Sequence, residues 1–279
     1  MTTASAELLA RLRRVRHVAL DMDGTIYRGK TLFAFTNGFL ALLHRLGITH
    51  SFLTNNCSKS LADYTAHLRG MGVAAEPGQI HTSAHAMIEL LRTRHPALRR
   101  LFLIGTPSLA AEMREAGYEL TTDSPEDAPD AVLVAFDLHL SFAAMCRAAY
   151  WIKQGRPFFA THPDRVCPTD EPTVILDCGA VCAALESATG RAPDAVAGKP
   201  APEMLRALCA RVGCAPEEMA MAGDRIYTDI EMARRAGALG VLVLSGEATA
   251  DDAAAAQPPP DLVLRDLEQF GELLLASRS

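Results

Sequence analysis

The sequence predicts an α/β protein built on a mostly parallel sheet. Short apolar runs of strand type alternate with stretches of helical periodicity along most of the 279 residues. Several of the helical stretches end at a glycine, and polar or acidic residues follow directly on the apolar runs. Alternation of this kind is typical of strands joined by crossover helices. No tandem repeat is evident.

The N-terminal third of the chain shows the alternation clearly. A first strand is expected at 17–24, HVALDMDG, a buried apolar run that ends in an acidic turn. A helical pattern over 35–47 stops at a glycine, and 49–56 is the next strand. The segment 61–72 is again a helix with a glycine at its end.

The same rhythm continues to the C-terminus. Strands are expected at 98–106 and 130–137, helices at 108–117 and 141–155, and a polar, proline-containing loop at 121–130. The last third is expected to hold a strand at 217–225, a helix at 229–237, a strand at 238–246, a short strand at 261–266 and a final helix.

Length and composition bound the class of protein. A mass of 30.0 kDa suggests one large domain or two modest ones, and 49 % apolar with 22 % charged residues disfavours disorder. The net charge is 27 − 33 = −6, which disfavours a nucleic-acid polymer as partner. No apolar run approaches the ~18 residues of a membrane span, and the N-terminus has no stretch of signal-peptide length, so a cytoplasmic protein is expected.

The seven cysteines form no CxxC pair, and no histidine pair lies near them at zinc-ligand spacing. Buried reduced thiols are the expectation. Cys178 and Cys182 are four residues apart and share a helical face, which leaves a reactive or metal-binding role open for that pair. His81 and His85 have the same spacing without the glutamate of a zinc-protease motif, and polar residues at a helix start are expected there.

Asp21 and Asp23 follow the first strand in VALDMDGT. Both carboxylates therefore lie at the carboxyl end of the sheet, where α/β proteins place their ligands. Two carboxylates this close repel each other, and a divalent cation such as Mg²⁺ relieves the repulsion. A carboxylate can also attack phosphorus and form an aspartyl phosphate. The alternative is a pair of turn-forming aspartates beside Gly24.

Thr54, Asn55 and Asn56 follow the second strand in SFLTNN. A hydroxyl and successive backbone N–H groups at a strand end can hold phosphate oxygens. The same residues are also common in ordinary turns.

Two further strand ends carry candidate residues. Lys199, in AGKPAPEML, stands just before a helix, where it could neutralise a phosphoryl group, or it could be a solvated surface lysine. Asp224 ends the strand in AMAGDRIYTDI and is best explained as a metal ligand. Asp229 is either a first-turn acid behind an N-cap at Thr228 or part of the metal site. Arg225 and Tyr227 lie in the same loop and could support the metal ligands from behind.

The ordered motifs VALDMDGT, SFLTNN, AGKP and AGDRIYTDI resemble those of the haloacid dehalogenase (HAD) superfamily of aspartate-nucleophile phosphatases. The 145 residues between Thr54 and Lys199 leave room for an inserted cap of type II. The tripeptide TNN, the segment ATHPDRVCPT and the run CGAVCAALESATGRAP are most similar to the NagD-type branch. The resemblance implies a Rossmann-like parallel-sheet core at 1–83 and 184–279, with an α/β cap at 84–183.

The resemblance also implies a role for each matching position. Asp21 corresponds to the nucleophile, Asp23 to the general acid, and Lys199 to the lysine that balances charge. Mg²⁺ is the implied cofactor. The resemblance implies three groups that bind it directly and one that contacts it through water. These are the carboxylates of Asp21 and Asp224, the backbone carbonyl of Asp23 and, through water, Asp229. Thr54 corresponds to the phosphate-binding hydroxyl, with Asn55 and Asn56 beside it.

Two segments depart from the family pattern. His162 stands where the family often has an asparagine, and Asp177–Ala180 replaces a Pro-Gly-Ala-like turn, although some NagD-type members have a Cys-Gly-Ala run. Both departures bear on substrate choice rather than on the chemical step. His162, Arg165 and Asp177 are therefore candidate specificity residues, with an ordinary surface role as the alternative.

The expected activity is Mg²⁺-dependent hydrolysis of a small phosphomonoester, such as a nucleoside monophosphate or a sugar phosphate, through an aspartyl phosphate. A phosphotransferase or mutase on the same nucleophile is one alternative. A regulator that binds phosphate or a nucleotide without turnover is another. The expected partner is a small phosphorylated metabolite, with no nucleic acid and no membrane, and a homo-oligomer is possible. The motifs do not name the substrate.

Overall fold

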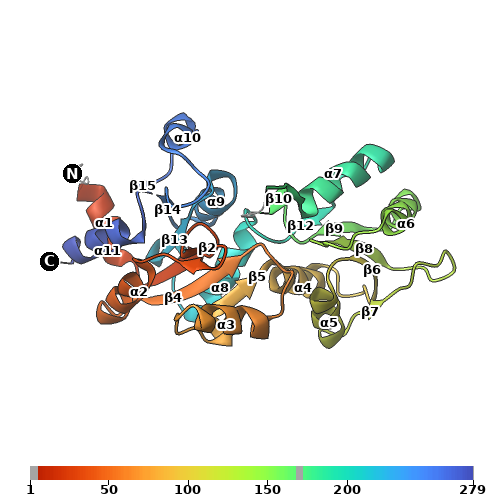
Figure 1. Ribbon diagram of the computed structural model, residues 1–279, viewed down its shortest axis with the longest axis horizontal. Coiled ribbons are helices and arrows are strands. Elements are labelled where there is room, and N and C mark those ends of the chain that lie inside the picture. Colours follow the sequence, from red (N-terminus) through yellow and green to blue (C-terminus); the bar gives the residue numbers. More distant parts are fainter. Residues whose placement is uncertain (1–5, 168–171, 279) are drawn as a thin grey trace. The chain divides into compact units, whose positions relative to one another are not determined.

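The computed structural model describes residues 6–167 and 172–278, which fall into two compact units (Figure 1). The core unit contains the described residues up to Thr54, residues 65–81 and those from Lys199 onward. The inserted unit contains residues 55–64 and 82–198. Its bounds differ from the range 84–183 mainly at the C-terminal end, where a helix and a strand continue the inserted unit to Gly198.

The core unit is organised around a six-stranded sheet of order β15-β14-β13-β1-β4-β5. The pairings of β1 with β4 and β13, of β13 with β14 and of β14 with β15 are all parallel. The central strands are mostly apolar and are buried along their whole length, as expected where both faces of a parallel sheet are covered. The strands are β1 (His17–Asp21), β4 (Thr49–Thr54), β5 (Ile80–Thr82), β13 (Met219–Gly223), β14 (Leu239–Val243) and β15 (Leu262–Leu264).

A small hairpin and several helices complete the core unit. Helix α11 packs against α1 and α2, and α8 packs against α9. Their bounds are α1 (Ala6–Arg14), α2 (Thr36–Arg45), α8 (Pro202–Val212), α9 (Glu231–Ala236), α10 (Ala250–Ala255) and α11 (Leu267–Ala276), with hairpin strands β2 (Tyr27–Arg28) and β3 (Thr31–Leu32). Helix α3 (Leu61–Gly70) includes residues of both units.

The inserted unit has its own parallel sheet of order β12-β9-β8-β6-β7. A short antiparallel pair, β10 with β11, lies outside this sheet. The strands are β6 (Arg100–Ile104), β7 (Glu119–Leu120), β8 (Ala131–Val134), β9 (Phe158–Ala160), β10 (Val166–Cys167), β11 (Ile175–Leu176) and β12 (Ala195–Val196). The helices are α4 (Ser83–Arg94), α5 (Pro107–Glu115), α6 (Phe142–Lys153) and α7 (Cys178–Thr189).

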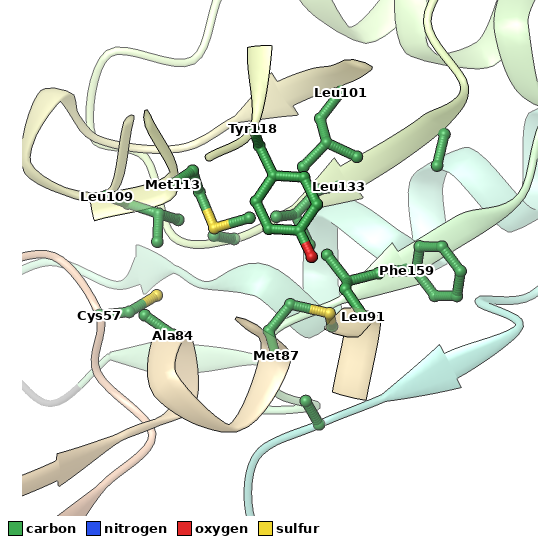
Figure 2. Packing of buried hydrophobic residues seen from close by; sticks show 13 residues of the cluster. Cys57, Ala84, Met87, Leu91, Leu101, Leu109, Met113, Tyr118, Leu133 and Phe159 are labelled. Carbon is green, nitrogen blue, oxygen red and sulfur yellow. The ribbon is translucent and has the colours of Figure 1, made fainter. Parts of the chain in front are cut away.

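Successive residues of β6 and β8 face opposite sides of this sheet, so the inserted unit has two cores. Leu101 and Leu133 pack with Met87 and Leu91 of α4 and with residues of α5, as Figure 2 shows. Their neighbours, Phe102 and Val132 among them, pack instead with residues of α6 and α7. Burial of these large side chains on both faces stabilises the unit by roughly 1.5–3 kcal/mol each.

The predicted α/β class and parallel sheet are confirmed. Nearly every expected strand and helix is present, with bounds shifted by a few residues. Within residues 6–167 and 172–278, no helix is both long and apolar enough to cross a membrane.

Two local expectations need correction. His81 is in strand β5 rather than at a helix start, and its Nδ1 lies 3.2 Å from the Arg211 guanidinium. All seven cysteines are free thiols, but Cys146 is exposed and Cys167 and Cys214 are half-buried, so only four are buried. The last two residues of the segment ATHPDRVCPT lie outside the described residues.

Candidate active site

Three neighbouring strands of the core sheet end at the same edge and bring their terminal residues there. Asp21 is the last residue of β1 and pairs in register with Leu53 of β4, so Thr54 is one residue further along. Asp224 follows the last residue of β13, the neighbour of β1 on its other side. Asp21, Thr54 and Asp224 are all buried, with exposed fractions of 8 % or less.

Lys199 is buried beside these carboxylates. Its Nζ contacts Asp21 Oδ1 in a short ion pair and lies 2.7 Å from Asp229 Oδ1. Burial alone would lower the pKa of Lys199, but the charges of Asp21 and Asp229 outweigh it and raise that pKa. Lys199 is therefore a fixed positive charge, and the surface position considered from the sequence is excluded.

Asp229 reaches the site from a π-helical turn, Ile226–Ile230, that precedes α9. Its Oδ2 accepts a hydrogen bond from the Arg225 backbone N–H at 3.1 Å, and the residue is fully buried. A role for Thr228 as N-cap is wrong, because Thr228 lies inside the π-helical turn and is buried. Such turns insert an extra residue and are frequent at functional sites. Here the turn aims Asp229 at Lys199.

Asp224 is enclosed by backbone. Its Oδ2 accepts a hydrogen bond from the Glu247 N–H at 2.7 Å, and a Cβ atom added at Gly24 or Gly246 would overlap its carboxylate. Gly24 also has a φ of +81°, a conformation that glycine adopts without strain. The Ser245 hydroxyl donates to the Gly24 carbonyl at 2.7 Å and joins the two glycine segments.

Gly246 and Glu247 were not singled out from the sequence. Their only signal is that SGE directly follows an apolar strand, as the other motifs do. The Glu247 carboxylate also pairs with the Arg225 guanidinium at 2.8 Å. Tyr227, considered with Arg225 as a supporting residue, is about half exposed.

The donor set of this cluster fits a hard divalent cation. Asp21, Asp224 and Asp229 each offer an oxygen, and these oxygens lie within 4.8 Å of one another. Asp224 Oδ1 is buried without a hydrogen-bond partner among the residues that the structure describes. Burial and the charges of Asp21 and Asp229 raise the pKa of Asp224 well above its usual range. A bound cation would remove that penalty, and an all-oxygen set suits Mg²⁺.

Asp23 is half-buried, and its environment differs from that of Asp21. Burial, together with the Asp21 charge, raises the pKa of Asp23 to about 6, although hydrogen bonds from Tyr27 and the Gly29 N–H counteract part of the shift. The Asp23 carboxyl thus holds a proton under mildly acidic conditions, in which ordinary aspartates are ionised. A proton donor two residues after a lysine-paired Asp21 is the arrangement that acid-assisted phosphoryl transfer needs.

The TNN segment spans the junction between the two units. Thr54 belongs to the core unit, whereas Asn55 and Asn56 belong to the inserted unit. The Asn55 amide donates to both oxygens of Asp164, at 3.2 and 3.3 Å. Asn56 Oδ1 accepts from the Ser58 N–H at 2.9 Å, as in a turn. Both asparagine side chains therefore have partners within the inserted unit.

Two family models match the chain, one over its N-terminal part and one over its C-terminal part. Residues 18–119 match a model described as haloacid dehalogenase-like hydrolase, and residues 196–270 match one described as HAD-hydrolase-like. D-glycerol 3-phosphate phosphatase of Mycobacterium tuberculosis is 34 % identical over 260 residues, which cover 91 % of this chain and 71 % of that protein. The chain belongs to the haloacid dehalogenase-like hydrolases.

Solved structures place it in the NagD-type branch of this family. A 4-nitrophenylphosphatase from Thermotoga maritima superposes with a TM-score of 0.87 at 35 % identity, covering 94 % of this chain and 98 % of the other. NagD from Escherichia coli superposes with a TM-score of 0.81 at 29 % identity, covering 91 % and 98 %. A glycerol phosphate phosphatase from M. tuberculosis, solved in complex with magnesium, has a TM-score of 0.85 at 31 % identity, covering 94 % and 78 %. The chain is accordingly a HAD-type phosphoric monoester hydrolase.

Proposed function

We propose that this phosphatase hydrolyses small phosphomonoesters in a Mg²⁺-dependent reaction that passes through an aspartyl phosphate on Asp21. The observation that carries the proposal is the buried cluster in which Lys199 pairs with Asp21 and Asp229 while Asp224 stands beside them. The Lys199 ammonium group contacts the Asp21 carboxylate and fixes its orientation. Phosphoryl transfer mainly requires this kind of positioning and charge neutralisation.

The reaction takes two displacements at phosphorus. In the first, an Asp21 carboxylate oxygen forms a bond to phosphorus while the ester P–O bond breaks, and Asp23 gives its proton to the departing alcohol oxygen. In the second, water attacks the phosphorus of the aspartyl phosphate, Asp23 accepts a proton from that water, and Asp21 leaves as a carboxylate. Asp23 is thus an acid in one step and a base in the next, which a pKa near 6 permits.

The metal ligands are proposed from the same cluster. Asp21, Asp224 and the Asp23 backbone carbonyl would hold Mg²⁺, which when bound supplies positive charge to the phosphoryl oxygens. Asp229 would support it from behind while it holds Lys199. The Thr54 hydroxyl and the backbone N–H groups of the TNN segment would bind the remaining phosphate oxygens.

The names of the relatives support small phosphorylated metabolites as substrates. One is a D-glycerol 3-phosphate phosphatase, and another, from Staphylococcus aureus, is an acid sugar phosphatase. Nucleoside monophosphates, sugar phosphates and glycerol or glycolate phosphates are the classes to test. Phosphoryl transfer to an acceptor other than water, a homo-oligomeric state and a cytoplasmic location remain predictions from the sequence.

The test is phosphate release from a panel of these esters, with Mg²⁺ and with EDTA, by the wild type and by Asp21→Asn. Activity should require the metal and fall by roughly 10⁴-fold or more in the variant, as for the loss of a nucleophile. Asp251→Asn, the same change at an exposed position of α10, is the matched control and should keep wild-type activity. Wild-type turnover in Asp21→Asn would contradict the proposal, and binding without release would favour the regulator.

A further inference from the structure

A second buried charge cluster lies wholly within the inserted unit. His162 has no exposed surface, and Asp164 and Asp177 are 5 % and 6 % exposed. The two ring nitrogens of His162 face different carboxylates. Nδ1 lies 3.7 Å from Asp164 Oδ2, and Nε2 lies 3.4 Å from Asp177 Oδ1. His162 and Asp177 are the two positions noted above as departures from the family pattern, and the fold brings them together.

The placement of the ring between two carboxylates favours its protonated form. At 3.7 and 3.4 Å these contacts are ion-pair distances rather than hydrogen bonds, and only the protonated imidazole carries the positive charge that both carboxylates would attract. Two buried carboxylates without a cation would repel each other strongly. The nearby thiols of Cys57 and Cys178 supply no charge, because burial raises the pKa of Cys57 to about 12 and that of Cys178 well above its usual range. Arg165, the cation next to Asp164 in the sequence, is exposed.

Each carboxylate of this cluster holds a different part of the inserted unit. Asp177 is the N-cap of α7 and accepts a hydrogen bond from the Cys178 N–H at 2.6 Å. Asp164 accepts both hydrogen bonds of the Asn55 amide. Its backbone carbonyl accepts from the Gly179 N–H at 2.7 Å.

Asn55 is held on its other side as well. Its backbone carbonyl accepts a hydrogen bond from the Ser83 hydroxyl at 2.5 Å, and a Cβ atom at Gly198 would overlap its side-chain oxygen. Asp164 and the close approach of Gly198 therefore hold the Asn55 side chain, and Ser83 holds its backbone carbonyl. Asn55 directly follows Thr54, the proposed phosphate-binding hydroxyl.

We propose that His162 is a positioning residue for phosphate binding. As an imidazolium between Asp164 and Asp177, it neutralises Asp164 and orients it toward Asn55, and so fixes the backbone of the TNN segment. This inference rests on the proposed phosphatase site. One ring nitrogen and a carboxylate oxygen of each aspartate also lie within 4.8 Å of one another, as three metal ligands would. An imidazolium is the favoured assignment, because a single ion binds only one of the two ring nitrogens and here each nitrogen faces its own carboxylate.

The first measurement is the protonation state of the ring. In the wild type, ¹⁵N chemical shifts of the His162 side chain should show protons on both nitrogens at neutral pH. Asp177→Asn keeps an oxygen that can cap α7 but removes one of the two charges, and the ring should then titrate at a lower pH. A wild-type ring with one proton at neutral pH would overturn the proposal. Stoichiometric zinc binding that is lost in His162→Asn would also overturn it, in favour of a metal site.

The second measurement separates positioning from a general loss of structure. In His162→Asn, which removes the ring but keeps a polar side chain, the KM and the inhibition constant of inorganic phosphate should each rise roughly tenfold, while kcat changes by about twofold or less. Asp177→Asn should shift the same constants in the same direction and serves if His162→Asn does not fold. His95→Asn, at a half-buried histidine that ends α4 and whose ring packs against Phe159, is the matched control and should change neither constant.

The outcomes distinguish this inference from the function on which it rests. If Asp21→Asn abolishes activity while His162→Asn and Asp177→Asn bind phosphate as the wild type does, the positioning role is wrong and the phosphatase mechanism stands. If Asp21→Asn retains full activity, the mechanism itself is wrong. If both cluster variants keep the wild-type KM, kcat and phosphate inhibition constant and lose only stability, His162 is a structural residue and the proposal is wrong.

Discussion

The two buried charge clusters differ in how their charges balance. In the core unit, Lys199 pairs with Asp21 and Asp229, and Asp224 adds a third carboxyl group beside them, so that with all three ionised −3 + 1 leaves −2. In the inserted unit, two carboxylates face one imidazole, and a protonated ring leaves −1. In the inserted cluster, hydrogen bonds donated by the Asn55 amide and the Cys178 N–H stabilise this net charge of −1. In the proposed function a divalent cation offsets the larger excess, whereas in the inserted cluster the proposed imidazolium is the balancing charge.

Removing Lys199, the ammonium group that pairs with two carboxylates of the core cluster, should have the largest effect. In Lys199→Met the carboxylates of Asp21 and Asp229 lose their buried partner, so the free energy of unfolding should fall by about 3–5 kcal/mol and activity by roughly 10³-fold. Lys153→Met, at an exposed lysine, controls for the change of side chain. Adding Asp229→Asn to Lys199→Met should recover stability but not activity, as followed by denaturant unfolding and phosphate release. Equal stability of Lys199→Met and the wild type would show that Lys199 does not balance the buried charges of Asp21 and Asp229.

Two glycines allow the metal site to be perturbed separately from the inserted cluster. In Gly246→Ala the new methyl group overlaps Asp224, so the Mg²⁺ concentration for half-maximal activity should rise by roughly 10–100-fold. In Gly179→Ala the methyl group overlaps the backbone carbonyl of Pro163 in the inserted unit, and the Mg²⁺ requirement should be unchanged. Gly78→Ala, where a methyl group meets open space, is the neutral control. Equal Mg²⁺ requirements in Gly246→Ala and Gly179→Ala would contradict the assignment of the metal to the core cluster alone.

The raised pKa of Asp23 predicts a pH profile of moderate size. The group must be protonated to donate to the leaving alcohol, and its protonated fraction falls about tenfold per pH unit above about 6. For alkyl phosphates kcat/KM should therefore decline on the alkaline side of pH 6. For 4-nitrophenyl phosphate, whose leaving group needs little protonation, the decline should be shallower. Identical profiles for the two esters would show that Asp23 is not the acid.

The smallest expected effect is on the free energy of unfolding and concerns His17, a second buried histidine that differs from His162 in its surroundings. His17 is faced by hydroxyls, with Nδ1 2.7 Å from Thr49 Oγ1 and Nε2 3.1 Å from Ser51 Oγ. Burial and the nearby His50 lower the pKa of His17 to about 4. Because its folded pKa is below the unfolded value of about 6.5, His17 contributes stability above pH 6.5 that is lost as the pH falls toward 4.

The loss should amount to about 2 kcal/mol, measured by denaturant unfolding of the wild type at several pH values. His17→Gln lacks the titrating group and should show a correspondingly weaker dependence on pH over the same window. Parallel curves for the two proteins would contradict the assignment to His17. For His162, which lies between two carboxylates, we expect the opposite dependence on pH: its protonated form stabilises the folded state.

Much of the core site follows from local sequence. Asp21, Thr54 and Asp224 each follow an apolar run, and parallel strands necessarily end at one edge, so their approach is predictable. Lys199 is harder to predict, because nothing local to AGKP shows that it is buried or that Asp229 meets it. The π-helical turn that aims Asp229 was not foreseen, since Thr228–Asp229 has the ordinary composition of a helix start.

The inserted cluster could not be predicted from the sequence. His162, Asp164 and Asp177 come from a loop and a helix start whose approach depends on tertiary packing, and Asn55 lies 109 residues from its partner Asp164. The two departures from the family pattern were visible, but their contact was not. The same limit applies to Gly246, whose importance comes only from the closeness of Asp224.

The strand order of the core sheet also sets the order in which the chain can fold. β1 lies between β4, which begins at Thr49, and β13, which begins at Met219. During synthesis on the ribosome, the edge of β1 that pairs with β4 can be filled early. The edge that pairs with β13 stays unpaired until about 200 more residues have been made. The inserted unit is complete by Gly198 and can therefore fold first. The newly made chain thus carries an unpaired apolar edge along β1 for most of its synthesis, and this is the segment that a chaperone would need to shield.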